Sequence, residues 1–264
     1  MAGTRLDVEL VNRGVVPSRE QARGAILAGR VTIDGVVVTK AGAMVRPGAS
    51  VEIAVGPRYV SRGGLKLEAA LETFGVDPAG KDALDVGAST GGFTDCLLQR
   101  GARSVVALDV GYGQFAWQLR NDPRVRVLER TNIRSADAET VGGPFGIIVI
   151  DVSFIGLGKV LPAVHPFVRE DALCLALVKP QFEAGKGRVG KKGVVRDASI
   201  HRDVLQAVVT EAGSAGWIVK GLGWSPVKGP EGNIEFWIAL ATNGESGDID
   251  VDAVVTAAHV ALGG

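Results

Sequence analysis

The stretch 83–94, Ala-Leu-Asp-Val-Gly-Ala-Ser-Thr-Gly-Gly-Phe-Thr, places the tightest limit on how this 264-residue chain can fold. It is an apolar run broken by a glycine-rich turn, after which a helix-like segment begins. The glycines permit positive φ and close backbone approach, and Ser89 or Thr90 can cap a helix whose first amides are otherwise unpaired. The stretch therefore predicts a strand, a tight turn and a helix, an arrangement that suits a polar or anionic ligand.

Strand-like and helix-like segments alternate from Lys81 onward, which predicts an α/β domain with a Rossmann-like, mostly parallel sheet. Seven strands are expected, the last two forming an antiparallel end: 83–86, 104–109, 125–128, 146–151, 173–179, 217–220 and 234–240. Ligands of such sheets bind outside the carboxyl ends of the strands. We therefore expect the polar groups at those ends to converge on one crevice, namely the glycine loop, Asp109, Asn132, Asp151 and Lys179.

Asp109 lies about twenty residues beyond the glycine loop, where a carboxylate can accept both ribose hydroxyls of an adenosyl ligand. Nicotinamide dinucleotides require Gly-x-Gly-x-x-Gly spacing, which this loop does not supply. Residues 85–92 instead resemble the first motif of methyltransferases that use S-adenosyl-L-methionine. The cofactor-binding residues predicted on this basis are Asp85, Gly87, Ala88, Ser89, Thr90, Gly91, Gly92, Phe93, Asp109, Val110, Asn132, Ile133 and Asp151.

The residues after the fourth strand narrow the choice of methyl acceptor. Methylation of exocyclic amines in this enzyme class usually goes with Asn or Asp-Pro-Pro-aromatic there, whereas this chain has Asp151-Val-Ser-Phe154. Carbon methylation of a pyrimidine needs a cysteine nucleophile, but Cys96 and Cys174 both lie within apolar segments. Oxygen remains as the expected acceptor. A sugar 2′-hydroxyl needs a base, and a lysine made neutral by nearby positive charge and desolvation, such as Lys179, can take its proton.

A separate pattern occupies residues 4–55, with two helix-like stretches, the second capped by Ser18 and stopped by Gly29, and then short β-branched segments. It resembles the small RNA-binding domain named after ribosomal small-subunit protein four, in the strings Arg5-Leu-Asp, Ser18-Arg, Ile33-Asp-Gly and Pro47-Gly. Through Lys66 there are ten Lys and Arg against five Asp and Glu in a chain of zero net charge, although surface scatter alone can give such a bias. The resemblance implies RNA contacts at Arg5, Arg19, Arg23 and Arg30.

Taken whole, the chain resembles the TlyA family, in which this RNA-binding domain precedes a methyltransferase domain akin to the FtsJ-type ribose 2′-O-methyltransferases. The resemblance rests on strings that begin at Val60, Asp85, Asp109, Leu119, Asp151, Val178 and Gly232. It implies 2′-O-methylation of cytidine in 16S and/or 23S ribosomal RNA. The catalytic tetrad that it implies is Lys66, Asp151, Lys179 and Glu235. Taken singly, each of the four also has a plainer explanation as a cap, a partly buried lysine stem or a solvated side chain.

Residues 182–196 contain glycines and five cations, which predicts either a mobile loop that clamps a phosphate backbone or a merely solvated charged loop. The further RNA contacts predicted are Arg62, Lys186, Arg188, Lys191 and Lys192. Because A-form RNA hides its base edges in a deep groove, the target nucleotide is expected to be extruded into the pocket.

The predicted domains are residues 1–56 for RNA binding, 57–65 as a linker and 66–264 for methyl transfer. The chain is 46% hydrophobic, lacks an apolar window of about 18 residues and has only two cysteines. We expect a cytoplasmic monomer that acts on ribosomal RNA and ribosomal subunits, without integral membrane association or a metal site, and with its three histidines scattered. Two alternatives stay open: a membrane-active haemolysin, a name also attached to this family, and a non-catalytic RNA-binding factor for ribosome assembly.

Overall fold

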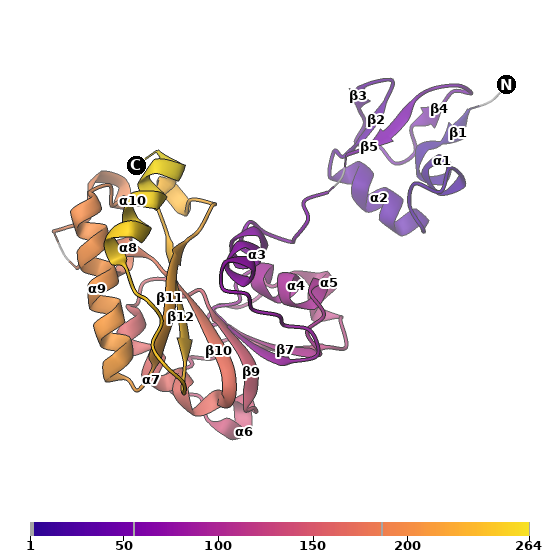
Figure 1. Cartoon of the computed structure of the whole chain (residues 1–264). Helices are drawn as coiled ribbons and strands as arrows, with labels where there is room; N and C mark the ends of the chain where they lie inside the picture. The colour runs from indigo at the N-terminus through magenta and orange to yellow at the C-terminus, as the bar shows by residue number, and fades with distance from the viewer. Residues whose placement is uncertain (1–2, 55, 186, 264) are drawn as a thin grey trace. The chain divides into compact units, whose positions relative to one another are not determined.

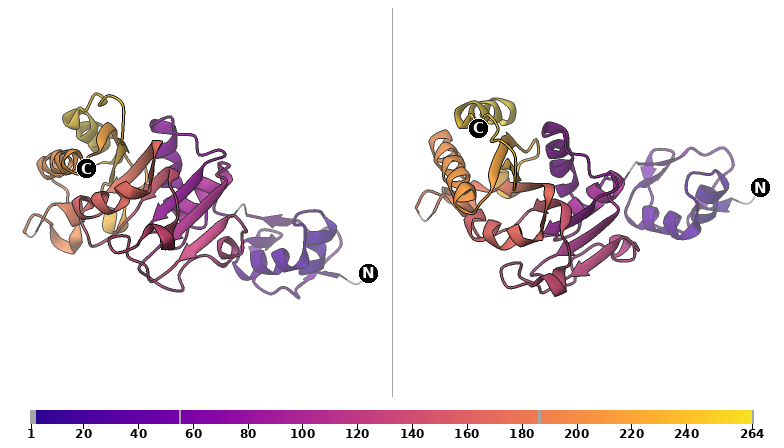
Figure 2. Two further views of the ribbon diagram at one scale, coloured as in Figure 1. Left: turned by 90° about the horizontal axis from the view of Figure 1, so that it is seen from below. Right: turned by 60° about the horizontal axis from the view of Figure 1, so that its bottom comes forward.

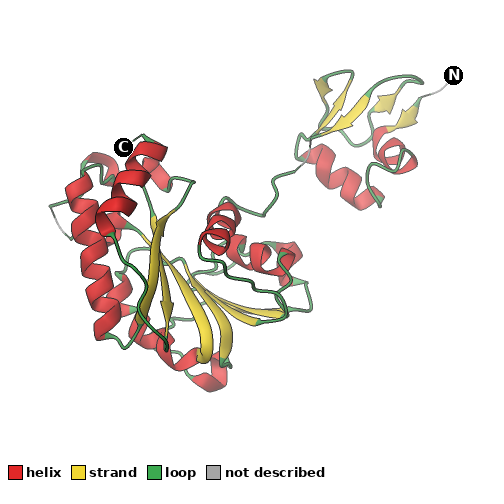
Figure 3. Ribbon diagram, in the orientation of Figure 1, coloured by secondary structure: helices red, strands yellow, loops and turns green. Residues whose placement is uncertain are grey.

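The computed structural model describes residues 3–54, 56–185 and 187–263. The chain divides into two compact units, Met1–Arg58 and Tyr59–Gly264, and each has its own hydrophobic core (Figure 1). Strands and helices alternate through most of the larger unit, whereas the smaller unit combines two helices with short strands (Figure 3).

The smaller unit follows the capping signals of its sequence. Helix α2 begins where the Ser18 side chain accepts a hydrogen bond from the Gln21 amide at 3.3 Å, and it ends before Gly29 at φ +68°. The elements are β1 (Thr4–Arg5), α1 (Leu6–Asn12), α2 (Arg19–Leu27), β2 (Val31–Ile33), β3 (Val36–Val37), β4 (Met44–Val45) and β5 (Val51–Ile53). Two helices followed by a small sheet, β3-β2-β5, are confirmed. The β1–β4 pair was not predicted, because strands of two residues show no alternation.

The larger unit is a three-layer α/β structure. Its first half comprises α3 (Gly63–Thr73), β6 (Asp82–Val86), α4 (Gly92–Gln99), β7 (Ser104–Leu108), α5 (Trp117–Arg120), β8 (Val125–Leu128), α6 (Ala138–Val141) and β9 (Phe145–Ile150). Its second half comprises η1 (Leu157–Lys159), α7 (Leu161–Val164), η2 (His165–Phe167), β10 (Val168–Val178), α8 (Pro180–Glu183), η3 (Lys191–Gly193), α9 (Ala198–Ser214), β11 (Ile218–Trp224), η4 (Pro230–Gly232), β12 (Phe236–Ala241) and α10 (Val251–Leu262).

The seven predicted strands form one sheet in the order β11-β12-β10-β9-β6-β7-β8. Strand β12 is antiparallel to both of its neighbours, and the other pairs are parallel, so the predicted antiparallel end is confirmed. Strand β10 is longer than predicted. It starts at Val168 with irregular pairing to β9, and the regular register begins only at Leu173.

Alternate side chains of the central strands pack on opposite faces of this sheet. Ile148 and Ile150 of β9 join the core under α9 and α10, whereas Ile147 and Val149 join the core under α3 and α4. Figures 1 and 2 show these two pairs of helices on either side of the sheet. A strand covered on both faces is fixed in register, so the ends of β6, β9 and β10 provide a firm edge for a site.

Part of the expected linker 57–65 belongs to the larger unit. The Tyr59 side chain is buried, and an added Cβ on Gly64 would lie 2.2 Å from its ring. Helix α3 already begins at Gly63. The pattern of Pro and Gly suggested a break in this segment, but it did not show that the ring of Tyr59 and the bare backbone of Gly64 fit together.

The prediction for the two cysteines is confirmed, whereas the prediction for the histidines is partly wrong. Cys96 and Cys174 are buried and free, as expected. The expectation of scattered histidines is wrong for two of the three, because His201 Nδ1 lies 2.8 Å from His259 Nε2. Their positions are 58 residues apart in sequence, and the packing of α9 on α10 brings them together.

Candidate active site

The glycine turn lies between β6 and α4, at the carboxyl edge of the sheet. Gly87 has φ +89°, and a Cβ on it would lie 2.4 Å from the carbonyl oxygen of Asp151. Gly91, which precedes α4, has φ +94° and would bring a Cβ within 2.6 Å of Leu119. Neither position accommodates an L side chain, so these glycines determine the shape of the turn.

A cavity of about 530 Å³ opens beside this turn. On its wall, Asp109 Oδ2 accepts a hydrogen bond from the Ser89 amide at 2.7 Å, and Asp109 Oδ1 accepts one from the Gly111 amide at 2.6 Å. Seven of the predicted cofactor-binding residues line this cavity: Gly87, Ser89, Asp109, Val110, Asn132, Ile133 and Asp151. The ends of β6, β7 and β9 therefore meet at one space, as the order of the strands requires.

Asp85 does not line this cavity but lies beneath the turn. Its side chain is buried, and Asp85 Oδ2 accepts a hydrogen bond from the Thr94 hydroxyl at 2.7 Å. Burial raises the pKa of Asp85 to about 7. The Asp85–Thr94 bond ties the end of β6 to the first turn of α4, so this carboxyl group supports the loop from the protein interior.

A second cavity, of about 240 Å³, lies on the other side of the turn and brings together the predicted tetrad. The tetrad residues come from α3, from the ends of β9 and β10 and from just before β12, and all of them line the cavity: Lys66, Asp151, Lys179 and Glu235. The predicted residues Ala88, Thr90, Gly92 and Phe93 of the glycine loop line it as well. Gly87, Ser89 and Asp151 belong to both cavities, which therefore share a wall.

The tetrad forms two ion pairs. Lys66 Nζ donates to Glu235 Oε2 at 2.5 Å, and these side chains are 9% and 0% exposed. Lys179 Nζ lies 2.6 Å from Asp151 Oδ1, a close ion pair outside hydrogen-bond geometry, and it donates to Ser153 Oγ at 2.9 Å. Burial raises the pKa of Glu235, and the positive charge of Lys66 opposes that shift.

Two residues next to Asp151 were not predicted as site residues. Ser153 accepts a hydrogen bond from Lys179. Phe154 has a left-handed backbone conformation, with φ +64°, and it is 89% exposed. The ring of Phe154 lies 4.9 Å from that of Phe182, centroid to centroid. Both residues could have been predicted from the string Asp-Val-Ser-Phe, which directly follows a buried strand, because residues at strand ends of such a sheet face the ligand.

Three of the predicted RNA contacts gather on one buried carboxylate in the smaller unit. The Asp7 side chain is 0% exposed and accepts hydrogen bonds from Arg5 Nε at 3.0 Å, Arg19 Nη2 at 3.0 Å and Arg23 Nε at 3.3 Å. The hydrogen bond from Arg5 holds the pKa of Asp7 well below its usual range, and those from Arg19 and Arg23 add to it. The arginine side chains are about half exposed, so a fixed cationic cluster faces solvent.

The other predicted RNA contacts lie in different settings. Arg30 is partly buried in the smaller unit, whereas Arg62 is exposed and lines the tetrad cavity. In the loop 182–196, Arg188 pairs with Asp203 at 2.5 Å and Lys192 is exposed. Lys186 and the side chain of Lys191 lie outside the described residues. The segment begins with the last two residues of α8 and contains the short turn η3.

Two further features bear on function. Over the described ranges, no three His, Cys, Asp or Glu side chains are grouped so that they could hold a metal ion. In the same part of the chain, no helix has the length and apolar character needed to cross a membrane.

The strand order, the glycine turn and the acid after the second strand define a methyltransferase of the Rossmann-like class. Residues 59–242 match the FtsJ-like methyltransferase family, and residues 4–51 match the S4 domain. The chain belongs to the TlyA family: it is 49% identical over 240 residues to the 16S/23S rRNA (cytidine-2′-O)-methyltransferase TlyA of Mycobacterium tuberculosis, a match that covers 90% of each chain. The fold class and the family expected from the sequence are thus confirmed.

Two other relatives show the range of names in this family. The 23S rRNA (cytidine-2′-O)-methyltransferase TlyA of Campylobacter jejuni is 37% identical over 186 residues, 70% of this chain and 72% of that one. A solved structure of a candidate hemolysin from Streptococcus thermophilus superposes with a TM-score of 0.75 at 42% identity, covering 99% of this chain and 97% of its own.

Proposed function

We propose that this protein transfers a methyl group from S-adenosyl-L-methionine to the 2′-oxygen of a cytidine ribose in 16S and/or 23S ribosomal RNA. One observation carries the proposal: two lysine–carboxylate pairs line a cavity that shares a wall with the cavity beside the glycine turn. The tetrad cavity suits an acceptor hydroxyl, and the cavity beside the glycine turn suits a methyl donor. The names of the two TlyA relatives support the choice of cytidine and of ribosomal RNA.

The residues around the larger cavity fit an adenosyl ligand. The Asp109 carboxylate, at the end of β7, is at the place where such folds bind ribose hydroxyls, and the bare backbone of Gly87 leaves room for close approach. Asn132 and Ile133 form the wall at the end of β8. When bound there, S-adenosyl-L-methionine supplies a methyl group on a positively charged sulfur.

The tetrad deals with the proton of the acceptor. One of Lys66 and Lys179, as the neutral amine, accepts the proton of the 2′-hydroxyl and becomes an ammonium ion, while the other, already an ammonium ion, balances the negative charge on the oxygen. Glu235 and Asp151 orient the two lysines. The oxygen then forms its bond to the methyl carbon as the carbon–sulfur bond breaks, and S-adenosylhomocysteine leaves.

The smaller unit supplies recognition, through the arginine cluster held by Asp7. In the larger unit, Arg62 lines the tetrad cavity and contacts the RNA backbone beside the extruded nucleotide. We further propose that the protein acts as a monomer. A ribosomal substrate would support a cytoplasmic location.

The proposal is tested by mass mapping of ribose methylation on ribosomal RNA from cells with and without this protein. We expect a 2′-O-methylcytidine that disappears with the protein and returns when purified protein, S-adenosyl-L-methionine and unmodified ribosomal subunits are combined. Binding of subunits without methyl transfer would support the non-catalytic alternative, which the intact glycine turn and tetrad argue against. Leakage of lipid vesicles by the pure protein, together with unmodified RNA, would support the haemolysin alternative.

A further inference from the structure

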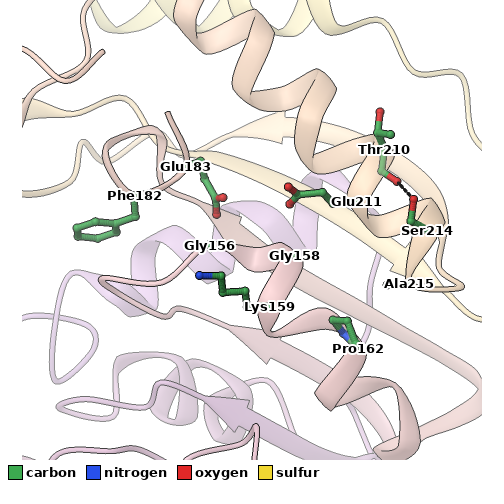
Figure 4. Close-up of a pocket in the computed structure, with 10 residues that line it drawn as sticks. All are labelled: Gly156, Gly158, Lys159, Pro162, Phe182, Glu183, Thr210, Glu211, Ser214 and Ala215. Atoms are coloured by element: carbon green, nitrogen blue, oxygen red, sulfur yellow. Dashed lines mark hydrogen bonds between the residues drawn. The ribbon is translucent and has the colours of Figure 1, made fainter. Parts of the chain in front are cut away.

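The string Lys-Pro-Gln-Phe-Glu after β10 ends at Glu183, and only its first residue, Lys179, belongs to the tetrad. Glu183 faces a third cavity, of about 540 Å³, between η1 and α9 (Figure 4). Figure 4 shows the side chains of Glu183 and Glu211 directed at the space above Gly156 and Gly158. This cavity is separate from the two that hold the proposed donor and acceptor sites. Its lining residues nevertheless include parts of the two segments that follow β9 and β10, and these strands end at the Asp151–Lys179 pair.

Four contacts join the segment after β9 to the segment after β10. Lys179 pairs with Asp151 and donates a hydrogen bond to Ser153, and Phe182 packs on Phe154. The fourth contact is a hydrogen bond from the Leu157 amide to Glu183 Oε1 at 2.9 Å. The regular pairing of β9 with β10 ends at Ile150 and Ala176, so beyond the sheet these side-chain contacts determine how the two segments are spaced.

The contact of Glu183 with Leu157 is a cap supplied from another element. Leu157 begins η1, and the first amides of a helical turn have no partner within it. The Leu157 side chain is buried in the core, so its amide cannot turn to solvent. Gly156 permits the approach, since a Cβ there would lie only 2.9 Å from Glu183 Oε2.

We propose that Glu183 is a positioning residue for methyl transfer: by capping η1 it fixes the segment Asp151–Phe154 against Lys179, without touching either substrate. This inference rests on the proposed function, because it assigns Glu183 a part in the same reaction. It acts on the spacing within one ion pair of the tetrad, so it affects the rate of the chemical step more than the affinity for either substrate.

The charge of Glu183 is adjusted by its surroundings. Burial raises the pKa of Glu183 to about 7, the Leu157 amide opposes this shift, and the negative charge of Glu211 on α9 adds to it. The other charged side chain lining this cavity is Lys159 on η1. A neutral carboxyl group accepts a weaker hydrogen bond than a carboxylate, so the cap weakens as the pH falls through about 7.

The experiment compares Glu183→Ala, Glu183→Gln and Glu211→Gln in the full chain under single-turnover conditions. Loss of a charge-assisted hydrogen bond should lower the rate constant of Glu183→Ala about tenfold, with dissociation constants for S-adenosyl-L-methionine and ribosomal RNA changed less than about threefold. Glu183→Gln keeps an acceptor oxygen, so it should recover most of the rate and lose the part of the pH dependence near 7. Glu211→Gln is the matched control from the same cavity: it should keep the full rate at pH 8 and shift that part of the pH profile to lower pH.

Two results would overturn the inference. One is a Glu183→Ala variant that methylates at the wild-type rate. The other is a loss in Glu183→Ala that Glu183→Gln does not reduce at all, with both variants folded by circular dichroism. A wild-type protein that transfers no methyl group would instead refute the proposed function, so the two failures can be told apart.

Discussion

Substitutions in the buried pair Lys66–Glu235 should affect the stability of the protein and its methylation rate in different ways. Lys66→Met removes the ammonium group but leaves a carboxylate that is 0% exposed beside a side chain of similar length. Breaking one side of a buried ion pair costs about 3–5 kcal/mol, because an uncompensated charge remains. We therefore expect the free energy of unfolding of the larger unit, measured by urea titration at pH 8, to fall by about that amount.

The size of this loss should depend on pH in a defined direction. Burial already raises the pKa of Glu235, and removing Lys66 takes away the charge that opposes the shift. A carboxyl group whose pKa is higher in the folded than in the unfolded state stabilises the fold below its unfolded value of about 4.3, and this contribution is lost as the pH rises through the folded value. The deficit of Lys66→Met should therefore be smaller at pH 5.5 than at pH 8.

The double variant Lys66→Met/Glu235→Gln completes the test. Replacing both charges is often nearly neutral, so it should recover most of the lost stability and fall within about 1.5 kcal/mol of the wild type. Methyl transfer should nevertheless stay at least about 100-fold below wild type, because proton transfer has lost one of its two lysines. A stable double variant with the wild-type rate would remove this pair from the mechanism, and an unchanged stability of Lys66→Met would show that the charges are not desolvated as argued.

Three further predictions concern two carboxyl groups of the larger unit and one of the smaller unit. Asp85→Asn should gain stability relative to wild type as the pH rises from about 4 to about 7 in urea titrations, by up to about 1.4 kcal/mol per pH unit, and the gain should level off above about pH 7, because the pKa of the carboxyl group is about 3.9 in the unfolded chain and about 7 in the folded protein; an Asp85→Asn variant with the same pH slope as wild type would contradict this. Asp109→Ala should weaken binding of S-adenosyl-L-methionine in calorimetry by about 1.5–3 kcal/mol, and an unchanged affinity would place the ribose elsewhere. Asp7→Asn should weaken binding of ribosomal RNA at constant salt although it removes a negative charge, because an amide keeps only one uncharged acceptor oxygen where three arginines share the two oxygens of a carboxylate; tighter binding would mean that charge alone governs the contact.

The sequence predicted those features that depend on local patterns. A short continuous apolar run rich in β-branched residues identifies a buried strand such as β9, and a turn that requires positive φ at Gly87 and Gly91 can be recognised from glycine alone. The four tetrad residues were available through the family resemblance. The resemblance did not show which lysine pairs with which acid, because Lys66 and Glu235 are 169 residues apart and only the packing of α3 near β12 brings them together.

Asp7 and Glu183 escaped prediction for a different reason. Asp7 and Glu183 look like ordinary charged residues of short helices, and neither follows a strand in the way that marks a ligand contact. Their importance arises from what they bind: three arginines in one case, and a buried amide of another element in the other. A single sequence does not contain these partners in any periodic or local pattern, whereas burial of a charged side chain in the folded protein points to them directly.

The shared wall between the two main cavities links the glycine turn to the chemistry of the tetrad. The carbonyl oxygen of Asp151 lies where a side chain at position 87 would have to be, and the side chain of the same residue pairs with Lys179. Glycine at position 87 therefore does more than admit a ligand, since it lets the end of β9 approach the end of β6 closely enough for one residue to border both spaces. Proposed donor and acceptor sites that share a wall of Gly87, Ser89 and Asp151 can bring the reacting atoms together without movement of the sheet, and the pairing of β6 with β9 keeps that separation fixed.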